Sequence, residues 1–149
     1  MAKRDNLYLD IADRVGQESH AVRAKVGAVL VRDDNILSMG YNGMPSGMDN
    51  CCEEEIRVVT GSTYQLKTKR EVLHAESNAL AKIAKSTLSS DGATMYVTLS
   101  PCMECAKLMV QSGIKRVVYR DQYRDLSSIT FLKQNNIKVE QYGDNERTN

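Results

Sequence analysis

One histidine and two cysteines stand at spacings that suit a metal site. His74 opens the run His-Ala-Glu, and Cys102 and Cys105 belong to the run Pro-Cys-Met-Glu-Cys. One imidazole and two thiolates are ligands that zinc prefers, and three protein ligands leave the fourth tetrahedral position for water. A structural zinc site has four protein ligands instead. We therefore expect His74, Cys102 and Cys105 to hold one catalytic Zn²⁺.

Glu76 supplies the proton-carrying group that a hydrolytic zinc site needs. It follows His74 by two residues, so its carboxylate can reach a metal-bound water without binding the metal. There it can take a proton from the water and pass it to a substrate nitrogen. The pattern H-x-E followed by P-C-x-x-C is typical of zinc-dependent nucleobase deaminases.

Simpler interpretations of these motifs are open but less favoured. A C-x-x-C pair can be a redox pair or half of a structural zinc site, and a single histidine at a helix start is more often solvated or part of a core. A redox pair needs no upstream H-x-E, and the sequence contains no second C-x-x-C. The joint occurrence of all four residues favours the catalytic site.

We expect the ligands at the beginnings of two helices. An apolar stripe at helical spacing runs from Val72 to near residues 89–92. Segment 94–99 has the β-branched and aromatic content of a strand, and the Ser-Pro pair at 100–101 suits the N-cap and first position of a second helix. Gly113 suits the position after that helix. Helix N-termini lower thiol pKa values and so favour thiolate ligands.

The remaining chain alternates between helical and strand patterns. The expected helices are 6–18, a short one around 53–59, and 127–134; the expected strands are 26–31 and 36–39, paired as a hairpin, then 116–119 and 137–142; loops are expected at 40–47 and after 59. Alternation of strands and helices in the second half indicates parallel strands joined by crossover helices. We expect one α/β domain over residues 1–149, with a polar, frayed tail from about 143.

Composition restricts the classes of function. The chain has 149 residues, with 20 basic and 19 acidic side chains for a net charge of +1. Proteins that hold long nucleic acids usually carry a strong basic excess. The apolar runs are shorter than the roughly 18–20 residues that span a membrane, and the polar start lacks a signal-peptide core. We expect a cytoplasmic protein with reduced cysteines and with neither nucleic acid nor a membrane as partner.

Longer motifs resemble those of the phage-type deoxycytidylate (dCMP) deaminases, within the zinc-dependent cytidine deaminase superfamily. The resemblance covers most of the chain and rests on AKVGAVLV (24–31), GYNGMPSG (40–47), NCCE (50–53), HAESNAL (74–80) and ATMYVTLSPCMECAKLMVQSGIKRVVY (93–119). The zinc motifs alone indicate only the superfamily. GYNG followed by Pro and Gly, together with HAExNA, narrows the resemblance to deoxycytidylate deaminases.

The resemblance implies a cytidine deaminase-like fold, three-layer α/β/α with a five-stranded mixed sheet. It also implies hydrolysis of dCMP to dUMP and ammonia, which supplies dUMP for thymidylate synthesis, in the host cytoplasm if the protein is phage-encoded. Zinc would bind His74, Cys102 and Cys105, with Glu76 as proton shuttle. The implied substrate contacts are the Ala75 N–H and the Ser100 carbonyl at the pyrimidine edge, Asn42 at the deoxyribose, Val26 near the base and Tyr123 near the nucleotide.

The substrate's 5′-phosphate needs a cation. The sequence offers Arg23, Lys25, Arg120 and Arg124 near segments that form the site. We favour Arg120 and Lys25, and an ordinary solvated charge is the alternative for each.

Regulation is a further implication of the resemblance. It implies a homohexamer that dCTP activates and dTTP inhibits, with Mg²⁺ accompanying the triphosphate. The second nucleotide site would use the GYNG loop, through Asn42, Gly43, Pro45, Ser46 and Gly47. Glycine-rich backbone can approach phosphates closely, whereas a tight turn without a ligand is the alternative.

Some members of the family carry a second, structural zinc, and this chain departs from their pattern. His20 stands where a cysteine ligand is expected, and the insertion 60–73 contains no histidine. We therefore expect one zinc per chain. Cys51 and Cys52 are then expected to be small buried residues beside the loop.

Two other functions remain open. One is a nucleic-acid base deaminase acting on tRNA or single-stranded DNA, which the neutral charge and the few aromatic residues disfavour. The other is a non-catalytic nucleotide-sensing module that keeps its zinc, which the intact Glu76 disfavours.

Overall fold

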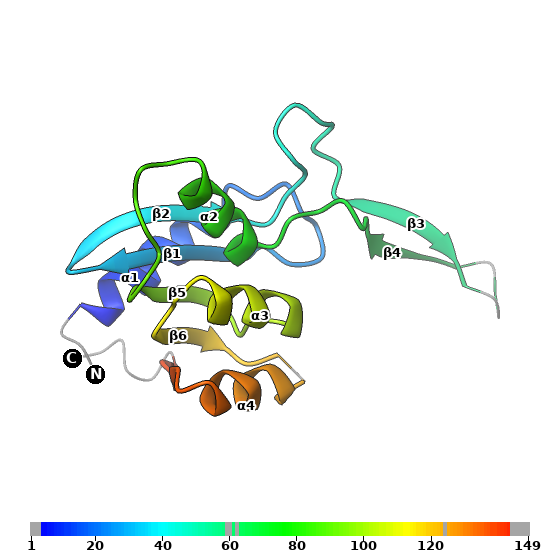
Figure 1. The fold of residues 1–149 in the computed structure, drawn as a ribbon. Coiled ribbons are helices and arrows are strands. Elements are labelled where there is room, and N and C mark those ends of the chain that lie inside the picture. The colour runs from blue at the N-terminus through cyan, green and yellow to red at the C-terminus, as the bar shows by residue number, and fades with distance from the viewer. Residues whose placement is uncertain (1–3, 59–60, 62, 124, 144–149) are drawn as a thin grey trace.

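A five-stranded mixed sheet forms the centre of the molecule (Figure 1). The computed structural model describes residues 4–143 except 59–60, 62 and 124. The strands are β1 Gly27–Arg32, β2 Asn35–Tyr41, β5 Thr94–Leu99, β6 Arg116–Asp121 and β7 Lys138–Gln141, in the order β2-β1-β5-β6-β7. Strand β1 is antiparallel to β2 and β5, whereas β6 is parallel to β5 and β7. The expected hairpin, the parallel pairs and the mixed sheet are confirmed.

Helices cover both faces of this sheet. Helix α1 (Asp5–Gly16) packs on one face, and α2 (Ala75–Ala84), α3 (Met103–Gln111) and α4 (Ser127–Gln134) pack on the other (Figure 1). Side chains alternate along β1, so Ala28 and Leu30 face α2 and α3 while Val29 and Val31 face α1. The three-layer α/β/α architecture is confirmed.

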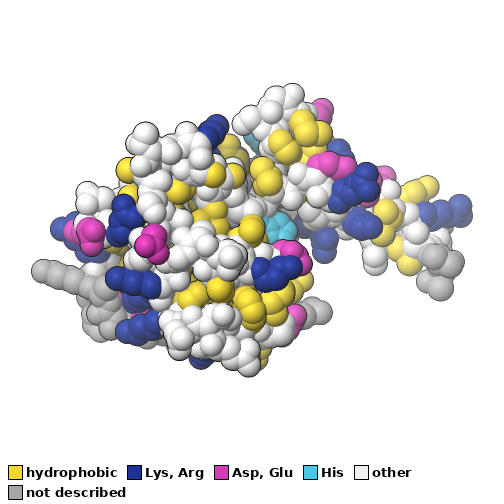
Figure 2. Space-filling view, in the orientation of Figure 1, with side chains coloured by type: hydrophobic (Ala, Val, Ile, Leu, Met, Phe, Trp, Pro, Cys, Tyr) yellow, Lys and Arg dark blue, Asp and Glu magenta, His cyan; other side chains and the backbone are white. Residues whose placement is uncertain are grey.

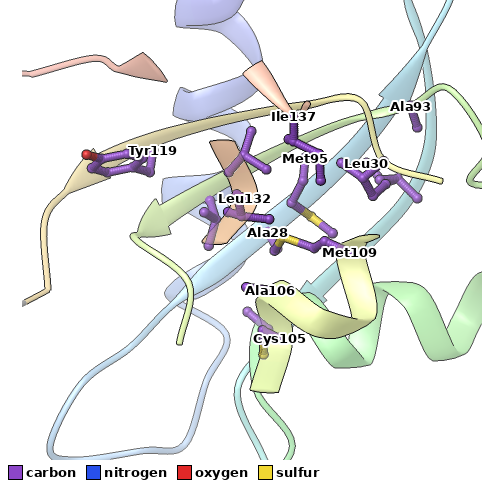
Figure 3. Packing of buried hydrophobic residues seen from close by; sticks show 14 of the residues in the cluster. Ala28, Leu30, Ala93, Met95, Cys105, Ala106, Met109, Tyr119, Leu132 and Ile137 are labelled. Atoms are coloured by element: carbon purple, nitrogen blue, oxygen red, sulfur yellow. The ribbon is translucent and has the colours of Figure 1, made fainter. Parts of the chain in front are cut away.

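The larger core lies between the sheet and the three helices. Met95 of β5 and Met109 of α3 are fully buried at its centre, beside Leu132 of α4 (Figure 3). Cys105 and Ala106 belong to the same cluster and begin the buried face of α3. The beginning of α3 is therefore anchored by core packing.

The two helix starts near the expected ligands lie later in the chain than the sequence pattern indicates. Helix α2 begins at Ala75 and not at Val72, and α3 has Cys102 as its N-cap. Ser100 does not cap α3, because the N-cap lies two residues later, and its Oγ instead accepts a hydrogen bond of 2.7 Å from the Tyr123 N–H. At the other end of α3, Gly113 has φ +80° just after the C-cap and so fits the expected position.

A two-stranded hairpin replaces the short helix expected around 53–59. Strands β3 (Glu53–Arg57) and β4 (Tyr64–Thr68) pair antiparallel and leave the body of the molecule as an arm (Figure 1). Three consecutive glutamates read locally as helix formers, but Glu54 pairs across the strands with Lys67. A cross-strand partner over ten residues away leaves no local signal, so the expected helix is wrong.

Two further expectations involve the ends and the surface of the chain. Most of the expected polar tail, residues 144–149, lies outside the described residues. In the part of the chain that the structure describes, every helix is too short or too polar to cross a bilayer.

Candidate active site

His74, Cys102 and Cys105 converge at the beginnings of α2 and α3. The His74 Nδ1 atom lies 3.3 Å from the Cys102 Sγ and 3.5 Å from the Cys105 Sγ. The three donor atoms lie within 4.8 Å of one another, and they form the group suited to a metal among the described residues. Cys102 and Cys105 follow His74 by 28 and 31 positions in the sequence, and the fold brings them next to it.

This donor set fits a zinc ion. Zinc bonds of about 2.3 Å to sulfur and about 2.0–2.1 Å to nitrogen at tetrahedral angles place the donors roughly 3.5 Å apart. The two nitrogen–sulfur distances agree with that separation. His74, Cys102 and Cys105 would therefore hold the ion with one position free for a small ligand, as expected from the sequence.

Two local features hold the first turn of α2 against the sheet. Gly40 of β2 lies where a Cβ would come within 2.4 Å of the Ala75 carbonyl oxygen, so only glycine allows this approach. The Asn78 side chain donates a hydrogen bond of 3.1 Å to the Tyr41 carbonyl. The sheet therefore fixes the helix turn that carries His74 and Glu76.

The two thiols titrate as a pair. The Cys105 thiol and the His74 ring stabilise the Cys102 thiolate and lower its pKa to about 3. The same contact with Cys102, together with burial, raises the pKa of Cys105. A divalent cation favours the thiolate form of both residues. The site therefore combines Cys102, which is already a thiolate at neutral pH, with Cys105, whose thiol must lose its proton on metal binding.

Glu76 lies beside these ligands in the first turn of α2, with 4% of its surface exposed. Burial raises its pKa to about 7, against the opposing effects of its own N–H and of His74. A nearby divalent cation would lower this pKa again. A carboxyl that titrates near neutrality can both accept and release a proton during one reaction.

A cleft of about 320 Å³ opens onto this group of residues. Small-molecule sites commonly measure about 300–1,000 Å³. Its walls come from several parts of the fold. The segment before β1 and the end of β5 lie together, because β1 runs antiparallel to β5 and so begins where β5 ends. The other parts are the residue after β2, the base of the hairpin, the starts of α2 and α3, and Tyr123 after β6. The lining residues are Ala21, Arg23, Ala24, Val26, Asn42, Glu53, Thr68, Val72, His74, Ala75, Glu76, Leu99, Ser100, Cys102 and Tyr123. The molecule is hollowed where the hairpin leaves the body, and basic side chains lie along the arm (Figure 2).

Comparison with known proteins assigns this arrangement to a family. Residues 2–121 match the family described as the cytidine and deoxycytidylate deaminase zinc-binding region. The chain belongs to the cytidine and deoxycytidylate deaminase family. The deoxycytidylate deaminase of Enterobacteria phage T4 is 39% identical, over 77% of this chain and 76% of that protein. That of Mycobacterium phage D29 is 43% identical, over 77% of this chain and 92% of that protein.

Solved structures of deaminases share the fold as well. The dCMP deaminase of the cyanophage S-TIM5, in complex with dCMP and dUMP, superposes with a TM-score of 0.82 at 41% identity. The match covers 95% of this chain and 99% of that one. The cytidine deaminase-like fold expected from the sequence is confirmed, and the phage-type resemblance is confirmed with it.

The deaminase cleft brings together five of the expected substrate contacts, which are Val26, Asn42, Ala75, Ser100 and Tyr123. As the first residue of α2, Ala75 has a backbone N–H without a partner inside the helix. Asn42 binds the backbone on both sides of residue 25, since its Oδ1 accepts from the Val26 N–H at 2.8 Å and its Nδ2 donates to the Ala24 carbonyl at 2.8 Å. Asn42 therefore shapes the cleft wall, and its contact with a sugar stays a prediction.

The two cations favoured for the phosphate lie elsewhere. Arg120 is 3% exposed and is paired with Asp10 and Asp13 of α1 at 2.5 and 2.6 Å, because a buried guanidinium needs carboxylate partners. Lys25 lines a neighbouring hollow beside Asp13. Arg23 is the one cationic residue among the described residues that line the cleft, and Arg124 lies outside the described residues.

The expected allosteric residues are divided by the fold. Asn42 lines the cleft, whereas Gly43, Pro45, Ser46 and Gly47 belong to the loop that follows β2 and are not among the lining residues. Gly43 exchanges two backbone hydrogen bonds with Leu73, at 2.8 and 3.1 Å, and Gly47 has φ +90°. The loop is thus bound near its start, at Gly43, to the segment that precedes α2.

The second cysteine pair behaves as two different residues. Cys52 is buried, as expected, but Cys51 is exposed, so that part of the expectation is wrong. His20 is also exposed. Sequence reasoning missed Glu53 and Thr68 in the cleft wall, because it placed residues 53–59 in a helix and the residues after 59 in a loop. Glu53 is the last residue of the NCCE motif (50–53), and that motif was the sequence signal that could have indicated it.

Proposed function

We propose that this chain hydrolyses dCMP to dUMP and ammonia and so supplies dUMP for thymidylate synthesis. One observation carries the proposal: two of the three metal ligands, His74 and Cys102, line the same cleft as the buried Glu76 and Arg23. The third ligand, Cys105, lies beside His74, with its Sγ 3.5 Å from the His74 Nδ1. Membership of the family and the cyanophage deaminase in complex with dCMP and dUMP support the same substrate.

The residues of the cleft divide the reaction among them. A zinc ion on His74, Cys102 and Cys105 supplies, when bound, a water molecule of lowered pKa. Glu76 takes a proton from the attacking water and delivers it to the amino nitrogen. The water oxygen bonds to C4 while the second water proton goes to N3. The C4–N4 bond then breaks, ammonia leaves, and the oxygen remains as the C4 carbonyl of dUMP. The Ala75 N–H and the Ser100 carbonyl orient the pyrimidine edge, and Val26 packs against the base.

Arg23 completes the substrate contacts at the phosphate. Its side chain is exposed within the cleft, so it can meet a dianion without losing an internal ion pair. A guanidinium is suited to phosphate because it donates in a planar fork. The nucleotide is thereby distinguished from the nucleoside. Tyr123, 54% exposed at the cleft, contacts the nucleotide as well.

Regulation and assembly belong to the same proposal. The chain forms a homohexamer, and dCTP with Mg²⁺ activates it while dTTP inhibits it through the loop of Gly43, Pro45, Ser46 and Gly47, with Asn42 linking that loop to the cleft. It acts in the cytoplasm, where thiol ligands stay reduced. Sigmoidal dCMP kinetics that become hyperbolic with dCTP support the second site, and kinetics indifferent to both triphosphates reject it. Sedimentation measures the assembly.

Turnover of four substrates tests the main proposal. We expect deamination of dCMP, weak deamination of deoxycytidine and dCTP, and none of a cytosine-containing oligonucleotide. Activity on the oligonucleotide with inert dCMP would establish the nucleic-acid deaminase instead.

Glu76→Ala tests whether the domain is catalytic. We expect kcat for dCMP to fall by roughly 10²–10⁴-fold, with zinc content unchanged. Glu104→Ala is the matched control, because Glu104 is an exposed carboxylate in the first turn of α3 that pairs with Lys107. A loss of zinc in Glu76→Ala would show that Glu76 has been given the wrong role.

A further inference from the structure

Glu53 holds the backbone of the segment that carries Arg23. Its side chain belongs to a residue that is only 8% exposed, at the first position of β3. One carboxylate oxygen, Oε1, accepts hydrogen bonds from the Val22 N–H at 2.8 Å and from the Arg23 N–H at 3.1 Å. A buried carboxylate that accepts two backbone donors makes strong, charge-assisted bonds.

The segment between α1 and β1 depends on such side-chain contacts for its shape. It has no strand pairing before Gly27. Besides the two bonds to Glu53, the Asn42 side chain binds Ala24 and Val26, and the Ser19 Oγ accepts from the Ala21 N–H at 3.1 Å. Removal of Glu53 therefore releases the part of the segment at Val22 and Arg23, while the other contacts remain.

The hairpin base also contacts the Arg23 side chain. Thr68 of β4 lies opposite Glu53 in the β3–β4 register. The Thr68 Oγ1 is 3.5 Å from the Arg23 Nη1, and Thr68, Glu53 and Arg23 all line the cleft. The backbone and the guanidinium of Arg23 are thus both held from the same end of the hairpin.

We propose that Glu53 is a positioning residue for phosphate recognition: its carboxylate fixes Val22 and Arg23 so that the Arg23 guanidinium lies ready for the substrate's 5′-phosphate. This inference rests on the proposed function. A free carboxylate beside a phosphate would repel the phosphate. The Glu53 carboxylate instead accepts hydrogen bonds from two backbone N–H groups, and it acts on the substrate only through Arg23. The hairpin arm thereby contributes to substrate selection from outside the metal centre.

Kinetics on two substrates separate this role from a merely structural one. Glu53→Ala is expected to raise the KM for dCMP about tenfold with kcat nearly unchanged, since one oriented charge contact is lost. The kcat/KM for deoxycytidine, which has no phosphate, should stay at the wild-type value. Glu53→Gln keeps an acceptor oxygen and should recover most of the loss.

Glu54→Ala is the matched control, because Glu54 is the next residue of β3 and is exposed. It should leave both substrates unaffected. Arg23→Ala should raise the KM for dCMP, and adding Glu53→Ala to it should cost little more, because both changes remove the same interaction. Equal losses for dCMP and deoxycytidine, or fully additive losses in the double variant, would overturn the proposal.

Amide hydrogen exchange provides a readout that does not depend on turnover. In Glu53→Ala the Val22 and Arg23 amides should exchange faster, whereas the Val26 amide, held by Asn42, should not change. If wild-type protein fails to deaminate dCMP, the proposed function falls. If dCMP is deaminated but these two amides exchange at the wild-type rate in Glu53→Ala, the positioning role alone falls.

Discussion

The Arg120 guanidinium donates a hydrogen bond of 2.6 Å from its Nε to the Asp13 carboxylate. This bond lies on the face of the sheet opposite to α2 and α3, the two helices that begin at the metal ligands. A second bond of 2.5 Å joins Arg120 to Asp10. Both carboxylates lie on α1, so Arg120 fastens that helix to the end of β6. Its position in the sequence, next to an aromatic strand end, resembles that of a ligand-binding cation, but its role in the structure is to bind α1.

Arg120 and Arg23 should therefore respond differently to the same substitution. Arg120→Met should lower the free energy of unfolding by roughly 1–3 kcal/mol, because it removes charge-assisted bonds from a buried position. The KM for dCMP should not change. Arg23→Met should raise that KM and leave stability unaffected, because Arg23 is exposed. Urea unfolding and steady-state kinetics on both variants test these expectations. A raised KM with unchanged stability in Arg120→Met would instead indicate that Arg120 binds the phosphate.

Cysteine substitutions test the metal centre. Cys105→Ser should reduce zinc content from about one ion per chain to a small fraction and abolish turnover, because a hydroxyl is a poor zinc ligand. Cys51→Ser should keep both zinc and activity, since Cys51 is exposed and is not part of the ligand group. Atomic absorption measures the metal. Zinc loss in Cys51→Ser would point to a second metal site near the loop.

Gly40→Ala tests how the sheet supports the catalytic helix. The added Cβ would lie 2.4 Å from the Ala75 carbonyl oxygen and 2.7 Å from the Ala79 nitrogen, so α2 must move. Overpacking of this kind costs about 1–3 kcal/mol of stability. Because His74 and Glu76 move with α2, kcat should fall as well. Gly61→Ala, whose nearest contact is 3.7 Å away, should change neither quantity.

Stability should depend on acidity through Glu140. Arg116 donates to both Asp5 and Glu140 at 2.7 Å and lowers the pKa of the Glu140 carboxyl below its usual value of 4.5. The unfolded chain therefore binds this proton more readily, so the stabilisation is complete above about pH 4.5 and is lost as the pH falls through the folded-state pKa. The difference in unfolding free energy between wild type and Glu140→Gln should shrink from about pH 6 to about pH 3. A constant difference across that range would contradict the assignment.

Some features could be predicted from sequence because their signals are local. Strand β5 and helix α4 have the predicted bounds, since β-branched residues and apolar spacing lie within each segment. His74, Glu76, Cys102 and Cys105 each stand in the first turn of a helix or at its N-cap, close to the helix starts that the sequence predicts. Their places within the two helices follow from short-range rules, whereas their meeting also depends on how α2 and α3 pack on the sheet.

Other features depend on partners far away in the chain. The pairing of Glu53 with Thr68 decides that segment 53–57 is a strand, and nothing within that segment indicates it. Arg120 and Arg23 are equivalent as isolated arginines, and only the neighbouring α1 carboxylates separate them. For the same reason, the sequence does not indicate that Cys51 is exposed and Cys52 is buried, because this difference depends on the position of the hairpin that follows them.

The three ligands also connect two segments that start 28 residues apart. An ion held by both segments would bind the folded arrangement in preference to the unfolded chain, in which the three ligands are far apart. Metal affinity and folding would then be coupled. Chelation would therefore lower the free energy of unfolding as well as the activity, because it would remove the link between the beginnings of α2 and α3.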